Sequence, residues 1–434
     1  MIKVLKFGGT SVGSAANMKK VAEIVRREQA RITVLSAMYG KNDSLVRISR
    51  AAASGDRNAI EEQLAMLTDK YTRCIEELLR ERKQQALARM NATFGLIRDE
   101  AAAFEEYESE RKIIAQGELL TSAIFTAYLQ ETGLKAECLY SPDFMVKDPG
   151  EKVDTERIGR ALARVAGDDS TFFVAQGFIC SDSQGRIDNL GRGGSDYSAA
   201  LMGAAVEAAE VQIWTDIDGM HNNDPRFVDN TRPIRTMSFD EAAELAYFGA
   251  KILHPATIQP CKDHGIAVLL KNTMDPEAPG TTISNRDDDT KSFHAVAAKD
   301  GITVIRIHSA RMLMAYGFLR KVFEIFEQYR TPIDMITTSE VAVSLTVDND
   351  SHIDEIVRDL SALGSIEIER GNSIVCVVGR MEHGDAGLAA RVFECVRGVP
   401  IKMISYGASH RSLAILIDTE HKKRTLQCLN DGLF

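Results

Sequence analysis

The chain has 434 residues, of which 44% are hydrophobic and 26% charged, and its formal net charge is −10. This length allows two or three domains with sizeable cores, and the negative charge argues against general binding to nucleic acid or to an anionic membrane. The seven cysteines form no Cys-x-x-Cys pair, which favours reduced thiols and a cytoplasmic protein over a disulfide framework or a zinc site. We expect no signal peptide and no membrane span, because the N-terminus enters a strand directly and no apolar run is long enough.

The segment Ile2–Ser11 has the pattern of a short buried strand that ends in a glycine turn. A helix is expected to follow over about Ala15–Glu28. Lys6 stands at the end of the strand, just before Gly8 and Gly9. Two glycines, a helix N-terminus and a lysine can together hold a phosphate. A plain strand-to-helix turn with a solvated lysine explains the stretch equally well, because short glycine motifs are weak evidence.

A second buried strand is expected over Ile32–Ala37, followed by a loop at the end of the sheet where ligands gather in α/β proteins. From about Ser44 to Leu129, Ala, Leu, Glu, Arg and Gln dominate without a proline, which predicts helices. The segment Gln116–Glu118 places a glycine and an acid between two helical runs. We interpret it as a surface loop, with a buried functional acid as the alternative.

Strands and helices alternate from there to about residue 290. This alternation predicts a largely parallel sheet covered by helices on both faces. The polar and charged segment 284–292 predicts a domain boundary. The expected strands are Lys135–Tyr140, Thr171–Gln176, Val211–Asp216 and Ala267–Asn272, and a helix is expected over Ser238–Tyr247.

A second glycine-rich stretch, Gly191–Gly194, opens an alanine-rich helix. Ser195 and Asp196 are natural N-cap residues for that helix. Arg192 lies among the glycines. A simple flexible linker needs neither the arginine nor the capping pair, so this stretch is a second candidate anion site.

The C-terminal third contains an internal repeat of about 70 residues. Val322–Glu324 and Pro332–Ile336 recur as Val392–Glu394 and Pro400–Ile404. Each copy has the pattern strand, helix, strand, strand, helix, and the first adds a strand at Ser365–Glu369, which predicts the small split-βαβ sandwich. Open sheets leave edges to pair, so two such units pack side by side or against a second chain. A dimer contact and an amino-acid sensor both remain open uses of the repeat.

Several long motifs occur in order along the chain: Lys6–Ser11, Gly191–Asp196, Thr215–Gly219, Gly249–Pro255, and Phe318–Leu319 with Ile336–Val341. Over essentially its whole length the chain resembles a monofunctional aspartate kinase, which is an amino-acid-kinase domain followed by two ACT domains. The resemblance implies an α/β fold with an open, mostly parallel sheet covered by helices, and two ferredoxin-like βαββαβ domains. It places the catalytic domain at 1–290, with an aspartate-binding lobe at about 1–185 and an ATP-binding lobe at about 186–290. The repeats fall at 300–370 and 371–434 and share a strand from about 295–308.

The reaction that the resemblance implies moves the γ-phosphoryl group of ATP onto the side-chain carboxylate of L-aspartate, the first step toward lysine, threonine and methionine. The nucleophile is already an anion near neutral pH, so no general base is required. Charge neutralisation and in-line placement of two anions are required instead. Mg²⁺ is expected on the nucleotide, with no metal site on the protein.

The same resemblance assigns residues to roles. Arg192 grips the α-carboxylate of aspartate in bidentate fashion, and Glu118 takes the ammonium group. His221 stands where many relatives carry tyrosine, and Asn42 where relatives often have threonine. The implied catalytic residues are Lys6, Arg192 and Asp196; the ATP-binding residues are Lys6, Gly8, Gly9, Thr215, Asp216, His221, Arg226 and Lys251; the substrate-binding residues are Ser36, Asn42, Glu118, Arg192, Gly193, Gly194, Ser195 and Asp196.

The resemblance also implies feedback inhibition by an end-product amino acid, with lysine favoured, and a homodimer or dimer of dimers formed through the repeats. Met314 and Ala315 replace a histidine and a serine of the best-known lysine-sensitive type, and dimer packing is an alternative use of the segment. The implied effector residues are Met312, Gly317, Phe318, Leu319, Asp334, Thr338, Ser339 and Glu340.

Two other functions stay open: the same fold with another acceptor (glutamate, acetylglutamate, carbamate or UMP), and a non-catalytic amino-acid-binding regulator. A P-loop kinase is excluded, because the only Gly-Lys pair, Gly40–Lys41, has Leu35 in place of the first glycine of that motif.

Overall fold

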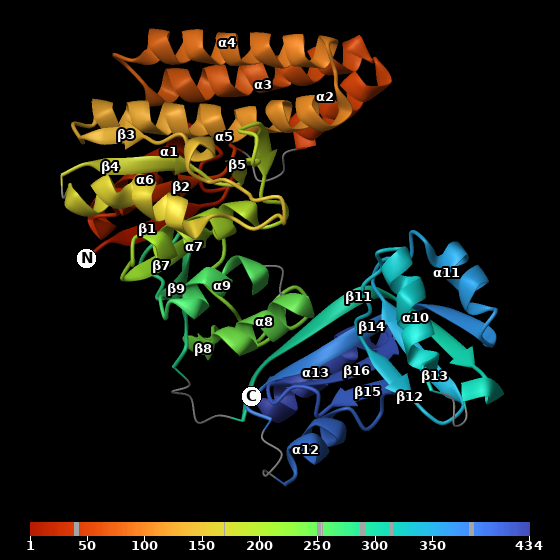
Figure 1. Ribbon diagram of the computed structural model, residues 1–434. Helices are drawn as coiled ribbons and strands as arrows, with labels where there is room; N and C mark the ends of the chain where they lie inside the picture. The colour runs from red at the N-terminus through yellow and green to blue at the C-terminus, as the bar shows by residue number, and fades with distance from the viewer. Residues whose placement is uncertain are drawn as a thin grey trace. The chain divides into compact units, whose positions relative to one another are not determined.

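The computed structural model describes residues 1–38, 43–168, 170–249, 253, 255–286, 292–312, 316–381 and 386–434. These residues form two compact units (Figure 1). No helix in the described part of the chain is both long and apolar enough to cross a membrane. The first unit comprises Met1–Met220, Arg235–Phe239 and Leu253–Asp287, and the second comprises His221–Ile234, Asp240–Ile252 and Asp288–Phe434.

An eight-stranded sheet forms the centre of the first unit, with the order β3-β4-β2-β1-β7-β9-β10-β8. Every neighbouring pair is parallel except β9 with β10, so the predicted parallel sheet is confirmed. A short antiparallel hairpin joins β5 and β6. The strands are β1 (Lys3–Phe7), β2 (Ile32–Leu35), β3 (Ala136–Cys138), β4 (Phe172–Gln176), β5 (Ile179–Ser181), β6 (Ile187–Asn189), β7 (Glu210–Thr215), β8 (Thr236–Ser238), β9 (Ala267–Asn272) and β10 (Thr281–Ser284).

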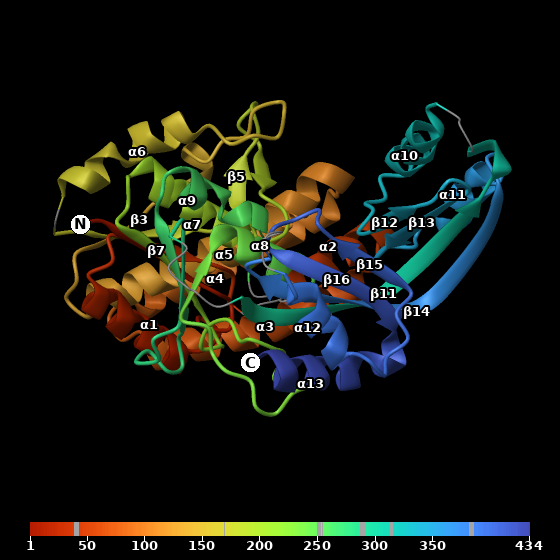
Figure 2. The ribbon, with the colours of Figure 1, turned by 90° about the horizontal axis from the view of Figure 1, so that it is seen from below.

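Helices cover both faces of this sheet (Figures 1 and 2). Helices α1 and α5 pack on one face and α7, with α6 and α9, on the other. Helices α2 and α4 pack against α5, and α3 packs against α1, α2 and α4. The predicted helical region therefore folds as four consecutive helices. The helices of this unit are α1 (Ala15–Glu28), α2 (Asp43–Ser54), α3 (Arg57–Leu78), α4 (Lys83–Ala102), α5 (Glu106–Glu131), α6 (Thr155–Gly167), α7 (Gly194–Ala205) and α9 (Gln259–Asp263).

The interpretation of Gln116–Glu118 as a surface loop is wrong. The segment lies inside α5, and all three residues are buried. Glycine weakens a helix by only about 1 kcal/mol relative to alanine, which packing readily outweighs. A Cβ on Gly117 would lie 2.8 Å from the Cβ of Ala37 and 3.0 Å from the Cδ1 of Leu45, so a glycine is what lets α5 approach the loop after β2 so closely.

The expected N-cap of α7 is also wrong. The N-cap is Gly193, whose φ of 73° lies in the left-handed region, and no side chain caps the helix there. Ser195 and Asp196 lie in the first turn of the helix instead. Their side chains are therefore free of a capping role and point toward other partners, described below.

The second unit contains one antiparallel sheet of six strands, with the order β12-β13-β11-β14-β16-β15. The repeat is confirmed: each copy runs strand, helix, strand, strand, helix. The two copies share the sheet through their long first strands, which pair along most of their length (Figure 2). The first copy is β11 (Phe293–His308), α10 (Phe318–Gln328), β12 (Ile336–Thr338), β13 (Ala342–Val347) and α11 (Ile353–Leu360); the second is β14 (Ser365–Gly379), α12 (Leu388–Cys395), β15 (Met403–Tyr406), β16 (Ser412–Asp418) and α13 (Lys422–Leu433).

The strand predicted over Ser365–Glu369 is the first third of β14 and continues ten residues further than expected, to Gly379. Two hydrophobic cores, one under each copy, hold the sheet: Val322 and Phe326 of α10 belong to the first, and Val392 and Leu426 to the second. Most of α8 (Phe239–Tyr247) also belongs to this unit.

Candidate active site

Three neighbouring strands bring the predicted site residues of the first unit to one edge of the sheet. Phe7 on β1 is paired in register with Leu35 on β2 and with Trp214 on β7. The residues that follow these positions therefore leave the sheet side by side. Ligands bind at the carboxyl ends of strands in open α/β sheets, so this edge is where a substrate is expected.

Lys6 and Asp196 form the central ion pair of this edge. The Nζ of Lys6 lies 2.6 Å from the Oδ1 of Asp196, and each side chain is only 12% exposed. The pair joins the end of β1 to the first turn of α7, which packs on β1. The N–H of Gly8 donates to the carbonyl oxygen of Trp214 at 3.2 Å, so this amide is engaged by the neighbouring strand end.

The loop after β2 contacts the same turn of α7. The hydroxyl of Ser36 donates to the Oγ of Ser195 at 3.0 Å, linking two predicted substrate residues that are far apart in sequence. Arg192 lies in the exposed turn just before α7. In the described part of the chain, no hydrogen bond or ion pair engages its guanidinium, which leaves the group available to an anion.

Glu118 is the most unusual group of the site, because its carboxylate is buried and only half satisfied. The backbone N–H of Ala37 donates to its Oε1 at 3.2 Å. Its Oε2 is buried and has no hydrogen-bond partner among the described residues. Burial raises the pKa of Glu118 to about 8. A cationic group placed against Oε2 would satisfy this oxygen and favour the ionised form.

The residues predicted for the nucleotide are divided between the two units. Thr215 is the last residue of β7 and Asp216 follows it at the edge already described, and the Thr215 hydroxyl donates to Asp216 at 3.0 Å. His221 and Arg226 belong to the second unit. There the His221 Nδ1 lies 3.0 Å from the Thr231 hydroxyl oxygen, and Arg226 is paired with Asp224 at 2.6 Å. Lys251 and Asn42 lie outside the described residues.

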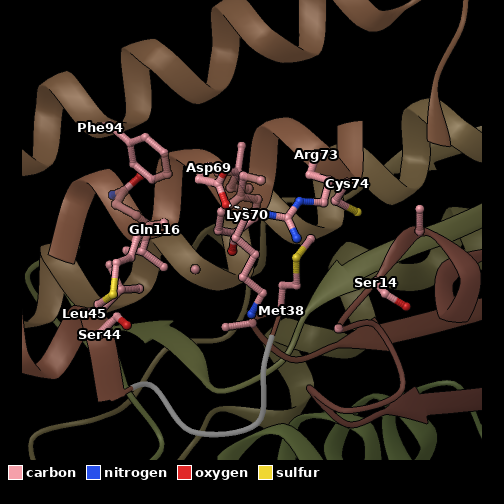
Figure 3. Close-up of a pocket in the computed structure, with 18 of the residues that line it drawn as sticks. Ser14, Met38, Ser44, Leu45, Asp69, Lys70, Arg73, Cys74, Phe94 and Gln116 are labelled. Atoms are coloured by element: carbon pink, nitrogen blue, oxygen red, sulfur yellow. Dashed lines mark hydrogen bonds and ion pairs between the residues drawn. The ribbon is translucent and has the colours of Figure 1, made fainter. Parts of the chain in front are cut away.

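A cavity of about 1130 Å³ lies next to this site, among α2, α3, α4, α5 and the start of α1 (Figure 3). Met38 lines it, and so do Lys70 and Arg73 of α3 (Figure 3). Burial lowers the pKa of Lys70 to about 8. Ala37 and Gly117 also line the cavity, and they are the chain neighbours of Ser36 and Glu118.

The predicted effector residues lie in the first copy of the repeat. Gly317 is the N-cap of α10, and Phe318 and Leu319 form its first turn. Met312 lies in a short turn before that helix. Asp334 precedes β12, and its side chain is 1% exposed. Thr338 ends β12, while Ser339 and Glu340 form the exposed turn into β13.

A metal site was predicted to be absent from the protein. Among the described residues, no group of three or more His, Cys, Asp or Glu side chains is arranged to hold a metal ion. Among the described residues, the carboxylates of this site include Asp196, which is paired with Lys6, the buried Glu118 and the exposed Asp216.

Comparison with known proteins shows the family to which this chain belongs. Residues 1–272 match the amino acid kinase family, and residues 375–433 match an ACT domain. The chain is 34% identical to lysine-sensitive aspartokinase 3 of Escherichia coli (strain K12), a match that covers 100% of this chain and 99% of that protein. The chain belongs to the aspartokinase family.

Solved aspartokinase structures agree with this assignment. The R-state crystal structure of E. coli aspartokinase III in complex with aspartate and ADP has a TM-score of 0.87, at 33% identity and with both chains covered completely. The T-state structure of the same enzyme with lysine and aspartate has a TM-score of 0.84, at 32% identity, and covers 100% of this chain and 99% of that one. The family and fold class predicted from the sequence are therefore confirmed.

Within this aspartokinase fold, two residues that support the site were missed by the sequence reasoning. The backbone N–H of Met38 donates to the Oγ1 of Thr121 at 2.9 Å, and the Tyr71 hydroxyl lies 3.4 Å from the same oxygen. Thr121 is three residues after Glu118 on α5, so both hold the loop after β2 from one helix face. Predicting one continuous helix over Glu106–Glu131 would have shown that Glu118 and Thr121 share a helix face. No local sequence pattern marks Tyr71 as a supporting residue.

Proposed function

We propose that this chain catalyses the ATP-dependent phosphorylation of the side-chain carboxylate of L-aspartate to 4-phospho-L-aspartate. The proposal rests above all on the buried, half-satisfied carboxylate of Glu118, which holds the loop after β2, together with Lys6 and Arg192 on the elements that meet at the same edge of the sheet. An amino acid with a second carboxylate offers one cation and two anions to such a site. Membership of the aspartokinase family supports the choice of aspartate.

Each proposed role follows from charge. Glu118 accepts hydrogen bonds from the substrate ammonium, and Arg192 binds the α-carboxylate. Ser36 and Ser195 orient the β-carboxylate. A carboxylate oxygen attacks the γ-phosphorus, the bond from phosphorus to the β,γ-bridging oxygen breaks, and ADP leaves. Lys6, held by Asp196, neutralises the transferring group.

The nucleotide-side and effector assignments belong to the same proposal. Thr215, Asp216, His221, Arg226 and Lys251 bind ATP, with Gly8 and Gly9 at the phosphates, and Asn42, Gly193 and Gly194 complete the aspartate site. Mg²⁺ bound to ATP would screen the phosphate charges. Lysine is the proposed inhibitor, supported by the lysine-sensitive relative, and the repeats form a homodimer or a dimer of dimers. We keep the catalytic domain at 1–290, with its aspartate lobe and its ATP lobe, and the repeats at 300–370 and 371–434.

The assay is formation of aspartyl hydroxamate by purified protein with Mg-ATP, aspartate and hydroxylamine. We expect product above the enzyme-free blank with aspartate, and none with glutamate, acetylglutamate, carbamate or UMP in matched assays that detect ADP release. Activity with one of those acceptors and none with aspartate would reject the proposed substrate. A protein that binds ATP but turns over no acceptor would be the non-catalytic regulator instead.

Replacing Arg192 with lysine is expected to raise the KM for aspartate by about tenfold or more, because an ammonium cannot bind a carboxylate through two parallel N–H groups. The kcat should change less. Arg164→Lys is the matched control, since Arg164 forms a bidentate pair with Glu137 on the surface of the same unit. Equal KM values for both variants and the parent protein would remove Arg192 from the aspartate site.

A further inference from the structure

We propose that the side chains of Tyr247 and Lys299 compete with the effector for the carboxylate of Asp334. An amino-acid ligand binds Asp334 only when these two side chains leave its carboxylate. This inference rests on the proposed function, in which Asp334 belongs to the effector site. It identifies the two groups that the ligand displaces. Because Tyr247 is the last residue of α8, ligand binding would release the end of that helix from Asp334.

Asp334 is occupied in the structure described here by groups of the chain itself. The Tyr247 hydroxyl donates to its Oδ1 at 2.7 Å, and the Lys299 ammonium donates to the same oxygen at 2.7 Å. The Asp334 Oδ2 is buried and has no hydrogen-bond partner among the described residues. A buried carboxylate of this kind is costly, and a better donor arrangement would stabilise it.

Lys299 places an ammonium group at Asp334, which is the same kind of group that an amino-acid ligand would bring. Its ammonium lies between Asp334 and Asp348, at 2.7 and 2.8 Å, and 4.6 Å from the centre of the Tyr247 ring. Burial alone would lower its pKa, but the two carboxylate hydrogen bonds outweigh burial and raise it. The Oδ1 of Asp334 already accepts hydrogen bonds from both Lys299 and Tyr247, so a ligand ammonium can bind this oxygen only in their place. The ligand therefore has to replace Lys299 rather than join it.

Tyr247 connects this carboxylate to α8 and to the segment that follows. The residue is the last of α8, and its ring packs edge-on against Phe248 at 5.0 Å. A Cβ on Gly249, which has a φ of 130°, would lie 2.1 Å from the carbonyl oxygen of Ala298. The segment just after α8 therefore packs directly against β11, next to Lys299. Lys251, a proposed ATP ligand, comes two residues after Gly249 in the sequence.

The second copy of the repeat shows the same position with the charge reversed. The N–H of Asp334 donates to the carbonyl of Thr346 on β13, and the N–H of Lys402 donates to that of Leu416 on β16, so the two residues are structural equivalents. The Lys402 ammonium is bound by Glu369 and Asp418 and lies 2.9 Å from the Asn372 Oδ1. The second copy therefore carries its own ammonium where the first would take one from a ligand. One ligand per chain is expected.

The test measures amino-acid binding to the full-length protein by titration calorimetry, using L-lysine first and then L-threonine and L-methionine. We expect one site per chain. Tyr247→Phe should tighten binding about three- to tenfold, because it removes one competing hydrogen bond to a charged group. Lys299→Gln should tighten it as well, and Asp334→Asn should weaken it at least tenfold. Tyr329→Phe, which removes a 2.8 Å hydrogen bond from a tyrosine to Asp359 in the same copy, should leave the affinity unchanged.

Weaker or unchanged binding by both Tyr247→Phe and Lys299→Gln would overturn the inference, as would two sites per chain or no binding of any of the three amino acids. The hydroxamate assay on the same samples separates this from the proposed function. Aspartyl hydroxamate formation without amino-acid binding leaves the kinase proposal intact. Tightened lysine binding by a protein that phosphorylates no aspartate would reject the kinase proposal alone.

Discussion

Replacing Lys6 with methionine is expected to lower kcat by about a thousandfold, because the variant keeps the length of the side chain and removes the positive charge proposed to face the transferring phosphoryl group. Charge stabilisation and positioning supply most of the rate acceleration in phosphoryl transfer, since no base is needed. The KM for aspartate should change little. Steady-state hydroxamate kinetics at saturating Mg-ATP check this directly.

Two further variants keep that result interpretable. Lys6→Arg retains a charge but changes its geometry, so it should recover part of the lost activity. Lys3→Met is the matched control, because Lys3 lies on the same strand and pairs with Glu28 and Glu210, at 3.0 and 3.1 Å. It should leave kcat within about twofold, the range expected for a partly exposed ion pair away from the reaction. A Lys6→Met protein that is folded and retains kcat contradicts the proposed role.

Elements whose determinants are local could be predicted closely from the sequence. Helix α1 spans Ala15–Glu28 as expected, because its boundaries are set nearby: the Ser14 hydroxyl accepts from the Asn17 N–H at one end, and Gln29 adopts a left-handed conformation at the other. The repeat was equally visible, since each copy must bury its own helices against its own strands.

Features that depend on distant partners could not be predicted in this way. The course of α5 through Gly117 is decided by contact with Ala37, 80 residues earlier in the chain, and not by helix propensity. The role of Asp196 depends on Lys6 across the sheet edge. The link from Asp334 to Tyr247 joins residues 87 positions apart on different elements, and no pattern within either segment indicates it.

Glu118 provides the second prediction of large effect. Glu118→Gln keeps the shape of the side chain and removes the charge that is proposed to bind the substrate ammonium. The KM for aspartate should rise about ten- to hundredfold, the loss expected for a buried hydrogen bond to a charged group. Glu108→Gln is the matched control, because Glu108 lies on the same helix and pairs on the surface with Lys112 at 2.9 Å. It should leave the KM unchanged.

The pH dependence gives an independent test, because burial raises the pKa of Glu118 to about 8. Below that pH the substrate-free site holds a proton that the substrate ammonium must displace, so the KM for aspartate should fall as pH rises from 6 to 8 in the parent protein and stay flatter in Glu118→Gln.

The stability of the parent protein should also depend on the ionisation of Glu118, and it should decrease as pH rises. Between the unfolded pKa of about 4.3 and the folded value, the native state binds more protons than the unfolded state, so the free energy of unfolding decreases as pH rises. Urea unfolding at pH 5 and pH 8 should therefore show Glu118→Gln gaining stability relative to the parent at the higher pH. Parallel changes in both proteins would contradict the raised pKa of Glu118, while an unchanged KM for aspartate in Glu118→Gln would contradict its role as the ammonium ligand.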